Sequence, residues 1–452
     1  MPLSRKTFVA SALAVALAAP RGAPAQNPGR IAFETYELDN GLTVILAEDH
    51  SAQVVAVDVW YHVGSRDERP GRSGFAHLFE HMMFQGSEHV KKGEHFQLVE
   101  RGGGDVNGST QTDRTNYWQV LPSNRLNLGL WLEADRMRSL AITDSNFINQ
   151  RETVKEERRL RVDNVPYVKA FIDETPALYD SSSCLPYARS IIGSMDDLNA
   201  AKTEDVKAFF DLYYSPNNAT LTVVGDFDPA EAKQVIQQYF GAIPRGQDPP
   251  PVSCNQPFNP GQMRKAVRDD KATVPAVLHA YRVPAYDHAD TPALDLLATI
   301  LGQGESSRLN RKLAREAKAA AVVQASLNPF GPRRGPGLFI ALGVVNQGVS
   351  ADSLDKLLTA EIAGIASGGV TAEELTKAQN SYRSDRINER QRALSVAEAL
   401  QAATLFLGNT DAVNTDFDRY MKVTPDDIKR VAAKYLIPAN SLILHVSSET
   451  AS

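Results

Sequence analysis

Cysteine is almost absent from this chain of 452 residues, which contains only Cys184 and Cys254. Neither residue belongs to a Cys-x-x-Cys pair or to a cluster with histidine. A disulfide-rich scaffold and a cysteine metal site are therefore both excluded. In an oxidising compartment the two thiols have only one possible pairing, but two unpaired thiols are an equally good interpretation of the sequence alone.

The apolar run at the N-terminus, residues 8–19, is too short to cross about 30 Å of hydrocarbon as a helix. Arg5 and Lys6 precede it and the small-x-small sequence Ala-Pro-Ala ends at residue 25, which is typical of a secretory signal. A core or amphipathic helix is the alternative, but the run has no polar face. No cysteine follows it that could carry a lipid anchor. We expect residues 1–25 to be a signal peptide and the mature protein to be periplasmic, without a membrane anchor.

Basic charge is also scarce. The chain has 48 Lys and Arg against 54 Asp and Glu, a formal net charge of −6. Removal of residues 1–25 takes away Arg5, Lys6 and Arg21 and no acid, which leaves 45 − 54, or −9. A protein this acidic lacks the basic surface that binds nucleic acid or an anionic membrane. Its 43% hydrophobic and 23% charged residues are typical of a globular protein, and its length allows two or three domains.

Two distant segments of the chain match without gaps. Five identical residues recur at a constant offset of 222 positions (427 − 205): Asp205, Lys207, Tyr213, Pro216 and Asn218 return as Asp427, Lys429, Tyr435, Pro438 and Asn440. Each copy predicts a helix, a Pro/Asn turn and an apolar strand. Chance similarity of two amphipathic helices is the alternative, but identity at five positions in register favours a duplicated domain.

A proline-rich stretch with little apolar content, residues 245–262, separates the copies and predicts a stiff, extended linker. We therefore expect an N-terminal domain over residues 31–244 and a homologous C-terminal domain over residues 263–450. In the first domain, strand-like and helical patterns do not alternate regularly; they lie at 43–47, 54–62 and 115–120, and at 72–84, 95–101, 125–138 and 145–161 respectively. The prediction is an α+β fold in which each domain is an antiparallel sheet with helices packed on one face.

One motif carries chemistry, the sequence His-Leu-Phe-Glu-His at residues 77–81. On a helix His77 and His81 lie one turn apart on one face, with Glu80 beside them. Two imidazoles at this spacing can share one Zn²⁺ while the adjacent carboxylate reaches a metal-bound water as general base. This order is the inverted form of the commoner zinc-protease helix. Histidines satisfied by hydrogen bonds on an ordinary helix are the alternative, but an apolar-flanked turn with two His and a Glu is costly without a metal.

A catalytic zinc needs a third protein ligand and an open position. The glutamate-rich stretch 150–159 is the obvious source. Phe147 and Val154, seven positions apart, mark the inward face of the predicted helix, and Glu157 lies near that face. The two other glutamates of the stretch project to the opposite side. Glu157 is therefore the expected ligand, against the alternative that all three glutamates are a solvated charge run.

With these motifs the chain resembles the pitrilysin/insulinase family of zinc peptidases, whose members include the mitochondrial processing peptidases. The resemblance covers essentially the whole mature chain, including residues 40–44, the motif at 77–87 and Gly225-Asp226-Phe227. It implies two similar α+β domains per half-enzyme, with two half-enzymes enclosing a clam-like chamber. It also implies Glu157 as the third ligand of one zinc per chain. The second-domain counterpart of the zinc helix has Asp295, Ala298 and Thr299 in place of the ligands and base, so no metal is expected there.

The resemblance also implies substrate contacts. The glycine-rich stretch 102–110 is similar to the family's edge strand, along which a peptide is added in extended form, with Asn107 and Gly108 as the expected contacts. A hairpin loop without a ligand is the alternative. The family uses an Arg and a Tyr of the facing half to hold the substrate carbonyl; Arg315 is present here, but Val322 stands where Tyr is expected. Valine cannot donate a hydrogen bond, so a homologous partner subunit is expected to supply an Arg/Tyr pair.

The sequence thus predicts a secreted zinc endopeptidase that hydrolyses peptides or small unfolded polypeptides, as the zinc-bearing subunit of a heterodimer. The alternative is a zinc-binding but non-catalytic subunit that assembles with a partner or presents peptides. The intact metal motif favours the enzyme. Mn²⁺ or Co²⁺ as the working metal stays open, because His₂Glu sites accept several divalent ions.

Overall fold

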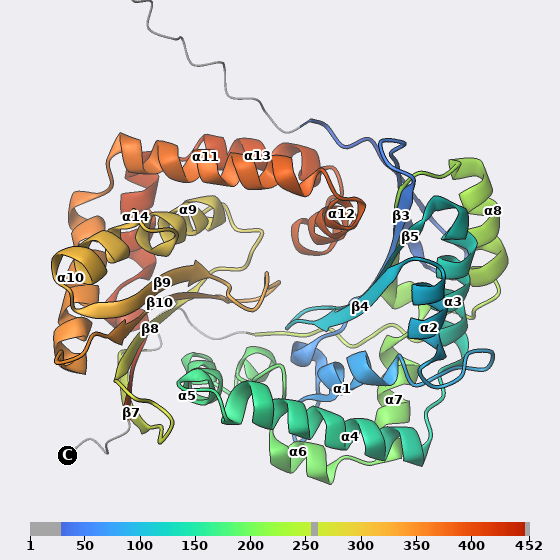
Figure 1. The fold of residues 1–452 in the computed structure, drawn as a ribbon, viewed down its shortest axis with the longest axis horizontal. Helices are drawn as coiled ribbons and strands as arrows, with labels where there is room; N and C mark the ends of the chain where they lie inside the picture. The colour runs from blue at the N-terminus through green and yellow to red at the C-terminus, as the bar shows by residue number, and fades with distance from the viewer. Residues whose placement is uncertain (1–28, 255–260, 448–452) are drawn as a thin grey trace, which may run out of the picture.

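A computed structural model describes residues 29–254 and 261–447 (Figure 1). The predicted signal peptide and part of the predicted linker lie outside the described residues. Two sheets form the centres of two halves. The first sheet has the order β1-β2-β6-β3-β5-β4, from β1 (Glu34–Glu37), β2 (Thr43–Glu48), β3 (Val54–Tyr61), β4 (Asp105–Thr110), β5 (Thr115–Pro122) and β6 (Ala219–Gly225). The second has the order β7-β11-β8-β10-β9, from β7 (Met263–Arg268), β8 (Ala276–Val283), β9 (Ala320–Leu327), β10 (Gly337–Val345) and β11 (Ser441–Ser447).

Each sheet is largely antiparallel but contains one parallel pair. These are β2 with β6 in the first sheet and β7 with β11 in the second. In each half, helices precede the last strand along the chain. This last strand then lies between two early strands: β6 between β2 and β3, and β11 between β7 and β8. The fold is therefore α+β with two corresponding sheets, as expected. The prediction of purely antiparallel sheets is wrong, because the long helical connection before the last strand of each half lets that strand pair in parallel with an early one.

Helices cover the outer face of each sheet. The first half contains α1 (Phe75–Met82), α2 (Glu94–Arg101), α3 (Leu126–Ser139), α4 (Asp144–Arg158), α5 (Val168–Glu174), α6 (Met195–Ala200), α7 (Thr203–Tyr213) and α8 (Pro229–Phe240). The second contains α9 (Thr291–Gly302), α10 (Ala351–Gly368), α11 (Ala372–Glu389), α12 (Ala393–Leu407), α13 (Ala412–Met421) and α14 (Pro425–Tyr435). Figure 1 shows α3 and α8 outside the first sheet and α10 and α14 outside the second. Among the described helices, none combines the length and apolar character that a membrane span requires.

The repeated sequence folds into repeated structure. Helix α7 and strand β6 begin at residues 203 and 219, and α14 and β11 begin at 425 and 441, so both pairs keep the offset of 222. Asn218 Nδ2 donates a hydrogen bond of 2.8 Å to the carbonyl of Tyr213, and Asn440 Nδ2 does the same to Tyr435 at 2.8 Å. The shared Asn therefore closes the same turn between helix and strand in both copies.

Each half also covers the inner face of the other half's sheet. Alternate residues of a strand face opposite sides, and Ile45 and Ala47 of β2 point away from α3 and α8. They pack against α12 of the second half, where Ala397 and Leu400 are buried. Gln401 of the same helix donates a hydrogen bond of 2.8 Å to the carbonyl of Thr220 in β6.

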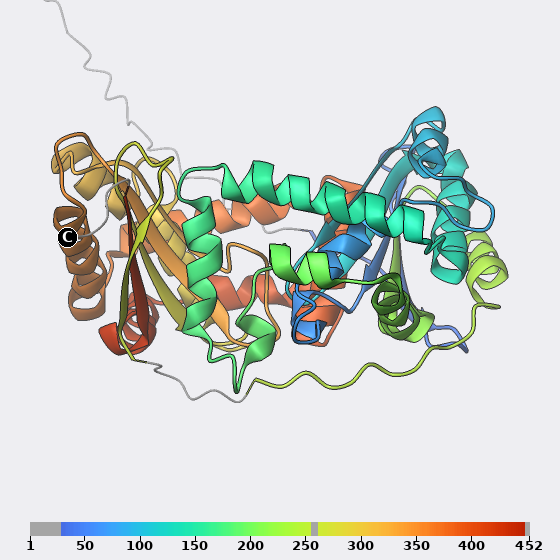
Figure 2. The same ribbon diagram turned by 90° about the horizontal axis from the view of Figure 1, so that it is seen from below.

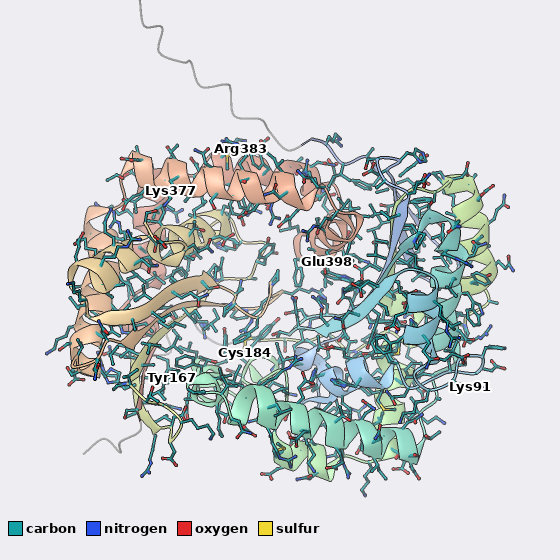
Figure 3. All side chains as sticks on the ribbon, in the orientation of Figure 1. Lys91, Tyr167, Cys184, Lys377, Arg383 and Glu398 are labelled. Carbon is teal, nitrogen blue, oxygen red and sulfur yellow. A yellow bond between two sulfur atoms is a disulfide. The ribbon has the colours of Figure 1, made fainter. Side chains whose placement is uncertain are left out.

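The reciprocal contact comes from the first half. Residues around α5 pack on the inner face of the second sheet, and this cluster contains Leu178, Tyr179, Leu278 and Leu444. Tyr167, labelled in Figure 3, lies just before α5. Its hydroxyl donates a hydrogen bond of 2.8 Å to the carbonyl of Val274. The two halves are thus interlocked by α5 in one direction and α12 in the other.

A disulfide bond adds a covalent link, and it settles the pairing that the sequence left open. Cys184 and Cys254 are bonded across 70 positions. Figure 2 shows the residues before Cys254 crossing from the first half to the second as an extended chain, as their prolines predict. The bond therefore fastens the end of this crossing to the segment that packs on the second sheet.

Candidate metal centre

Helix α1 carries the predicted motif and is held by its apolar face. Phe75, Leu78, Phe79 and Met82 are buried, whereas the two histidines project from the opposite side and are only partly buried. The helix begins after Gly74, which has φ of 88°. A Cβ at that position would lie 2.7 Å from the carbonyl oxygen of Ile192, so only glycine fits.

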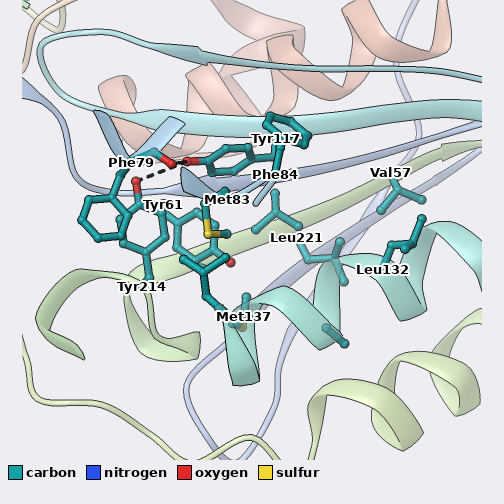
Figure 4. Close-up of a cluster of buried hydrophobic side chains, with 14 of the residues drawn as sticks. Val57, Tyr61, Phe79, Met83, Phe84, Tyr117, Leu132, Met137, Tyr214 and Leu221 are labelled. Atoms are coloured by element: carbon teal, nitrogen blue, oxygen red, sulfur yellow. Dashed lines mark hydrogen bonds between the residues drawn. The ribbon is translucent and has the colours of Figure 1, made fainter. Parts of the chain in front are cut away.

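A cluster of aromatic side chains fixes the height of α1 above the sheet (Figure 4). Phe79 stacks on Tyr214 with ring centroids 4.9 Å apart. The hydroxyl of Tyr117 on β5 donates to the carbonyl of Phe79 at 3.2 Å. Because close-packed aromatic rings allow little movement, this contact sets the position of the two histidines, which lie two residues before and two residues after Phe79.

The start of α1 is also fixed by a carboxyl group. Glu68 is buried and accepts a hydrogen bond of 3.0 Å from the backbone N–H of Ala76. Burial raises the pKa of Glu68 to about 8, although that N–H and Arg189 oppose the shift. The carboxyl thus accepts a hydrogen bond from a backbone N–H at the helix N-terminus that would otherwise have no partner, next to His77.

The structure brings together the three predicted ligands. Nε2 of His81 lies 3.1 Å from Oε2 of Glu157, and Nε2 of His77 lies 3.6 Å from the same oxygen. One ligand atom from each residue lies within 4.8 Å of the others. Ligand atoms around a tetrahedral zinc, at 2.0–2.2 Å from it, are roughly 3.3–3.5 Å apart. The donor set and its spacing therefore fit a zinc ion.

The electrostatics of the three groups suit a metal. Burial and the neighbouring His81 lower the pKa of His77 to about 4. The hydrogen bond with His81, opposed by burial, lowers the pKa of Glu157. At neutral pH the site therefore presents a neutral imidazole and an ionised carboxylate, the forms that bind a metal. The buried Nδ1 of His77 has no hydrogen-bond partner among the described residues, so this ring is held by packing.

Glu80 lies beside the ligands. Thr110 Oγ1 donates a hydrogen bond of 2.7 Å to its Oε2, which ties α1 to the edge strand β4. Burial raises the pKa of Glu80, although Thr110 and His81 counteract it. A carboxylate whose pKa is raised is a better proton acceptor, which is what general-base chemistry requires.

A cavity of about 360 Å³ opens beside these groups. His77, Glu80 and Glu157 form one wall, and Gly108 and Thr110 of β4 form another. Strand β4 pairs only with β5 among the described residues, so its other edge is free to accept an extended peptide. Asn107 is exposed on this strand, and a Cβ at Gly108 would lie 3.3 Å from Cγ of Glu80.

The structure does not bring Arg315 to this cavity. Arg315 lies in the segment Asn310–Glu316 of the second half, where it forms an exposed ion pair with Glu305. Val322 is 53% exposed on the edge strand β9. The family resemblance assigns both positions to the facing half-enzyme. That a partner subunit supplies the Arg/Tyr pair therefore stays a prediction.

The counterpart helix in the second half has a different environment. Asp295 of α9 accepts a hydrogen bond of 3.1 Å from the hydroxyl of Tyr420. Among the described residues, His77, His81 and Glu157 form the one group of three metal-binding side chains close enough to share an ion.

Several residues of the site carry no signal in the sequence. Arg161 is exposed and its Nη1 lies 2.8 Å from Oε1 of Glu157. Phe330, Arg333 and Leu338 of the second half line the cavity. They belong to a loop and to a strand about 170 residues beyond Glu157, and no spacing pattern connects them with the motif.

The sequence of this chain is similar to those of known proteins. Residues 43–174 match the model of Insulinase (Peptidase family M16), and residues 200–382 match that of the Peptidase M16 inactive domain. The chain is 33% identical over 410 residues to the zinc protease PqqE of Helicobacter pylori, with 89% of this chain and 90% of that protein covered.

Solved structures agree with these matches. A protease from Helicobacter pylori superimposes with a TM-score of 0.86 at 30% identity, over 92% of this chain and 99% of that one. Pitrilysin superimposes with a TM-score of 0.73 at 16% identity, over 95% of this chain and 46% of pitrilysin. The fold of the whole described chain therefore corresponds to about half of pitrilysin.

Proposed function

Because this chain belongs to the insulinase family of peptidases, we propose that it is a secreted zinc endopeptidase that hydrolyses peptides or small unfolded polypeptides. One observation carries the proposal. His77, His81 and Glu157 converge on one point, next to Glu80 and to the free edge of β4. This arrangement combines a metal site, a base and a surface for an extended chain in one cavity.

The residues of the site have separate roles. His77, His81 and Glu157 would hold the ion, and zinc bound there would supply a Lewis acid that activates water at neutral pH. Glu80 accepts a proton from the attacking water and then donates it to the leaving amine. Thr110 donates a hydrogen bond to one oxygen of Glu80, and the Glu80 side chain lines the cavity. Backbone groups of β4 hold the substrate in extended form.

We further propose that the working enzyme is a heterodimer. The family resemblance places an Arg/Tyr pair on the facing half, and Val322 cannot replace the tyrosine as a hydrogen-bond donor. The correspondence to about half of pitrilysin supports a second, homologous subunit. Substrate would then also meet Arg315 or its counterpart across the interface.

We place the protein in the periplasm. The predicted signal peptide supports export, and the Cys184–Cys254 disulfide is compatible with an oxidising compartment. One observation, the valine at position 322, favours the non-catalytic alternative, and it does so only if no partner supplies the missing tyrosine.

The first test is hydrolysis of a mixed library of unstructured peptides by the mature, zinc-loaded chain beside its Glu80→Gln variant. We expect both proteins to bind one equivalent of zinc, and turnover to fall at least about 100-fold in the variant, because a general base is lost. Chelation of the zinc should abolish hydrolysis by the parent.

Near-native turnover by Glu80→Gln contradicts the mechanism. Cleavage by the zinc-loaded parent alone would refute the need for a partner tyrosine, whereas the heterodimer predicts no cleavage by the parent alone. A homologous subunit with the Arg/Tyr pair is then added: restored cleavage supports the heterodimer, and peptide binding without cleavage supports the non-catalytic alternative.

A further inference from the structure

The cavity beside the metal ligands is closed on one side by the second half of the chain. The loop between β9 and β10 lies against the turn that follows β4. A Cβ at Gly331 would lie only 2.3 Å from the side-chain Cδ of Gln111, so the two turns are in close contact. Phe330, Arg333 and Leu338 contribute to the cavity wall from this side. A substrate at the metal site therefore touches both halves.

Arg333 is the unusual member of this wall because it is a buried cation. Its side chain belongs to a residue that is only 8% exposed. Nη1 donates a hydrogen bond of 2.8 Å to the hydroxyl of Tyr179, and the guanidinium lies 5.5 Å from the centre of that ring. The buried Nε has no partner among the described residues. Burial of a guanidinium whose N–H groups lack acceptors costs free energy, unless another group accepts hydrogen bonds from them.

An acid that interacts electrostatically with Arg333 does not hydrogen-bond to it. Oδ1 of Asp113 accepts from Nη1 of Arg66 at 2.6 Å and from the hydroxyl of Tyr187 at 3.1 Å, and its buried Oδ2 has no hydrogen-bond partner among the described residues, Arg333 included. Among the described residues, no carboxylate forms an ion pair with Arg333.

The other two arginines of the wall are engaged. Nη1 of Arg189 donates to the carbonyl of Glu68 at 2.6 Å, and Arg161 pairs with Glu157. Arg333 differs from both, because among the described residues its guanidinium donates only to a neutral hydroxyl and has no carboxylate at ion-pair distance.

We propose that Arg333 binds a carboxylate of the substrate, so that the enzyme selects peptides with an Asp or Glu side chain, or a free C-terminal carboxylate, close to the scissile bond. This inference rests on the proposed function, because the cavity is the one beside the metal ligands. The planar guanidinium can bind a carboxylate through two parallel hydrogen bonds. Ile172, Ile192 and Leu338 line the same cavity, and apolar walls strengthen such a contact by excluding water.

Equilibrium binding tests the inference without turnover. In the zinc-loaded Glu80→Gln protein, we would measure by fluorescence anisotropy a set of amidated, unstructured peptides in which one Glu moves through the sequence, each beside its Gln counterpart. A third version of each carries a free C-terminal carboxylate. We expect the acidic peptide to bind about tenfold more tightly at one position, or at the free terminus, as a charge-assisted hydrogen bond implies.

Two variants test whether Arg333 causes the preference for acidic peptides. Arg333→Gln should abolish the preference for the acidic peptide, with zinc content and melting temperature as checks of folding. Arg334→Gln is the matched control, because it makes the same charge change at an adjacent, exposed arginine, and it should keep the preference. If Arg333→Gln does not fold, Arg333→Lys should weaken the preference, because Lys retains the charge but lacks the planar fork.

The inference is wrong if the parent shows no preference for a carboxylate at any position. It is equally wrong if the preference survives Arg333→Gln, or stays unchanged in Arg333→Lys. These outcomes can be told apart from failure of the proposed function. Cleavage of the library without a preference for acidic peptides would support the peptidase and reject the role of Arg333. Binding of acidic peptides without any cleavage would support the role of Arg333 and reject the peptidase.

Discussion

The hydroxyl of Thr110 donates a hydrogen bond of 2.7 Å to Oε2 of Glu80. The two residues lie on different elements, β4 and α1, and both line the cavity. The bond orients the proposed base and at the same time ties it to the strand on which the substrate is expected to lie. A shift of β4 would therefore also shift Glu80, because the Thr110 hydroxyl links the two.

Replacement of Thr110 by Val should lower turnover about tenfold, because Glu80 loses the bond that orients it. Zinc content should stay at one equivalent, since none of the ligands is touched. Thr110→Ser keeps a hydroxyl and should retain most of the activity. Steady-state kinetics and zinc analysis of the three proteins check this; parental turnover in the Val variant would show that the bond has no role.

Arg161 should tune metal affinity. Its Nη1 lies 2.8 Å from Oε1 of Glu157, the oxygen that faces away from the histidines, but the side chain is 77% exposed. Exposed ion pairs contribute at most about 1 kcal/mol, so Arg161→Gln should weaken zinc binding by no more than about fivefold.

The chain offers a matched control for this change. Arg159 forms an ion pair of 2.9 Å with Glu156 on the solvent side of the same region. Arg159→Gln removes an equal charge without touching a ligand, and it should leave the zinc dissociation constant unchanged in a competition assay with a chelator. Equal effects of the two substitutions would indicate general electrostatics in place of a contact with Glu157.

The Cys184–Cys254 bond should stabilise the interlocked halves. It closes a loop across 70 positions, for which the chain-entropy model gives about 4 kcal/mol. Replacement of both cysteines by Ser should lower the urea midpoint accordingly, and addition of a reductant should bring the parent to the same midpoint. A midpoint that is unaffected by both treatments would contradict a stabilising role.

Acid should destabilise the second half through Glu374. Hydrogen bonds from Arg308, at 2.7 Å to each oxygen, lower the pKa of Glu374 to about 2, although burial opposes the shift. A group whose pKa is lower in the folded state stabilises it above the unfolded pKa, here 4.5, and loses that contribution as the pH falls towards 2.

Glu374→Gln should therefore cost on the order of 2 kcal/mol at pH 7, allowing for partial solvent screening, and much less at pH 2.5. Urea unfolding of the metal-free parent and variant at both pH values measures this, since removal of the zinc separates the effect from loss of metal. A difference between the two proteins that does not shrink on acidification would exclude Glu374 as the titrating group.

Much of the site follows from local sequence. The spacing of His77, Glu80 and His81 places them on one side of a helix, and α1 indeed spans them. The inward face of the helix that became α4 indicates Glu157, and the structure places Oε2 of its carboxylate 3.1 Å from Nε2 of His81. These predictions needed only the helical period and the apolar pattern, which are properties of adjacent residues.

Other parts of the site were beyond the sequence. The bond from Thr110 to Glu80 joins a strand to a helix, and Arg333 reaches the cavity from the other half of the chain. Neither pair of residues is related by a fixed spacing. Their proximity depends on where α5 and α12 cross between the halves, and nothing in a single helical or strand pattern specifies that crossing.

The sequence by itself therefore determined the metal-binding motif, the duplication at an offset of 222 and the α+β class, because helical period, strand alternation and repeated residues are encoded locally. Only the tertiary structure decided the disulfide, the parallel pair in each sheet, the exchange of α5 and α12, and the cavity wall with its buried Arg333. Those features arise when segments far apart in the chain bury each other's apolar faces. The hydrophobic effect that drives this burial is non-directional, so composition alone does not reveal which surfaces meet.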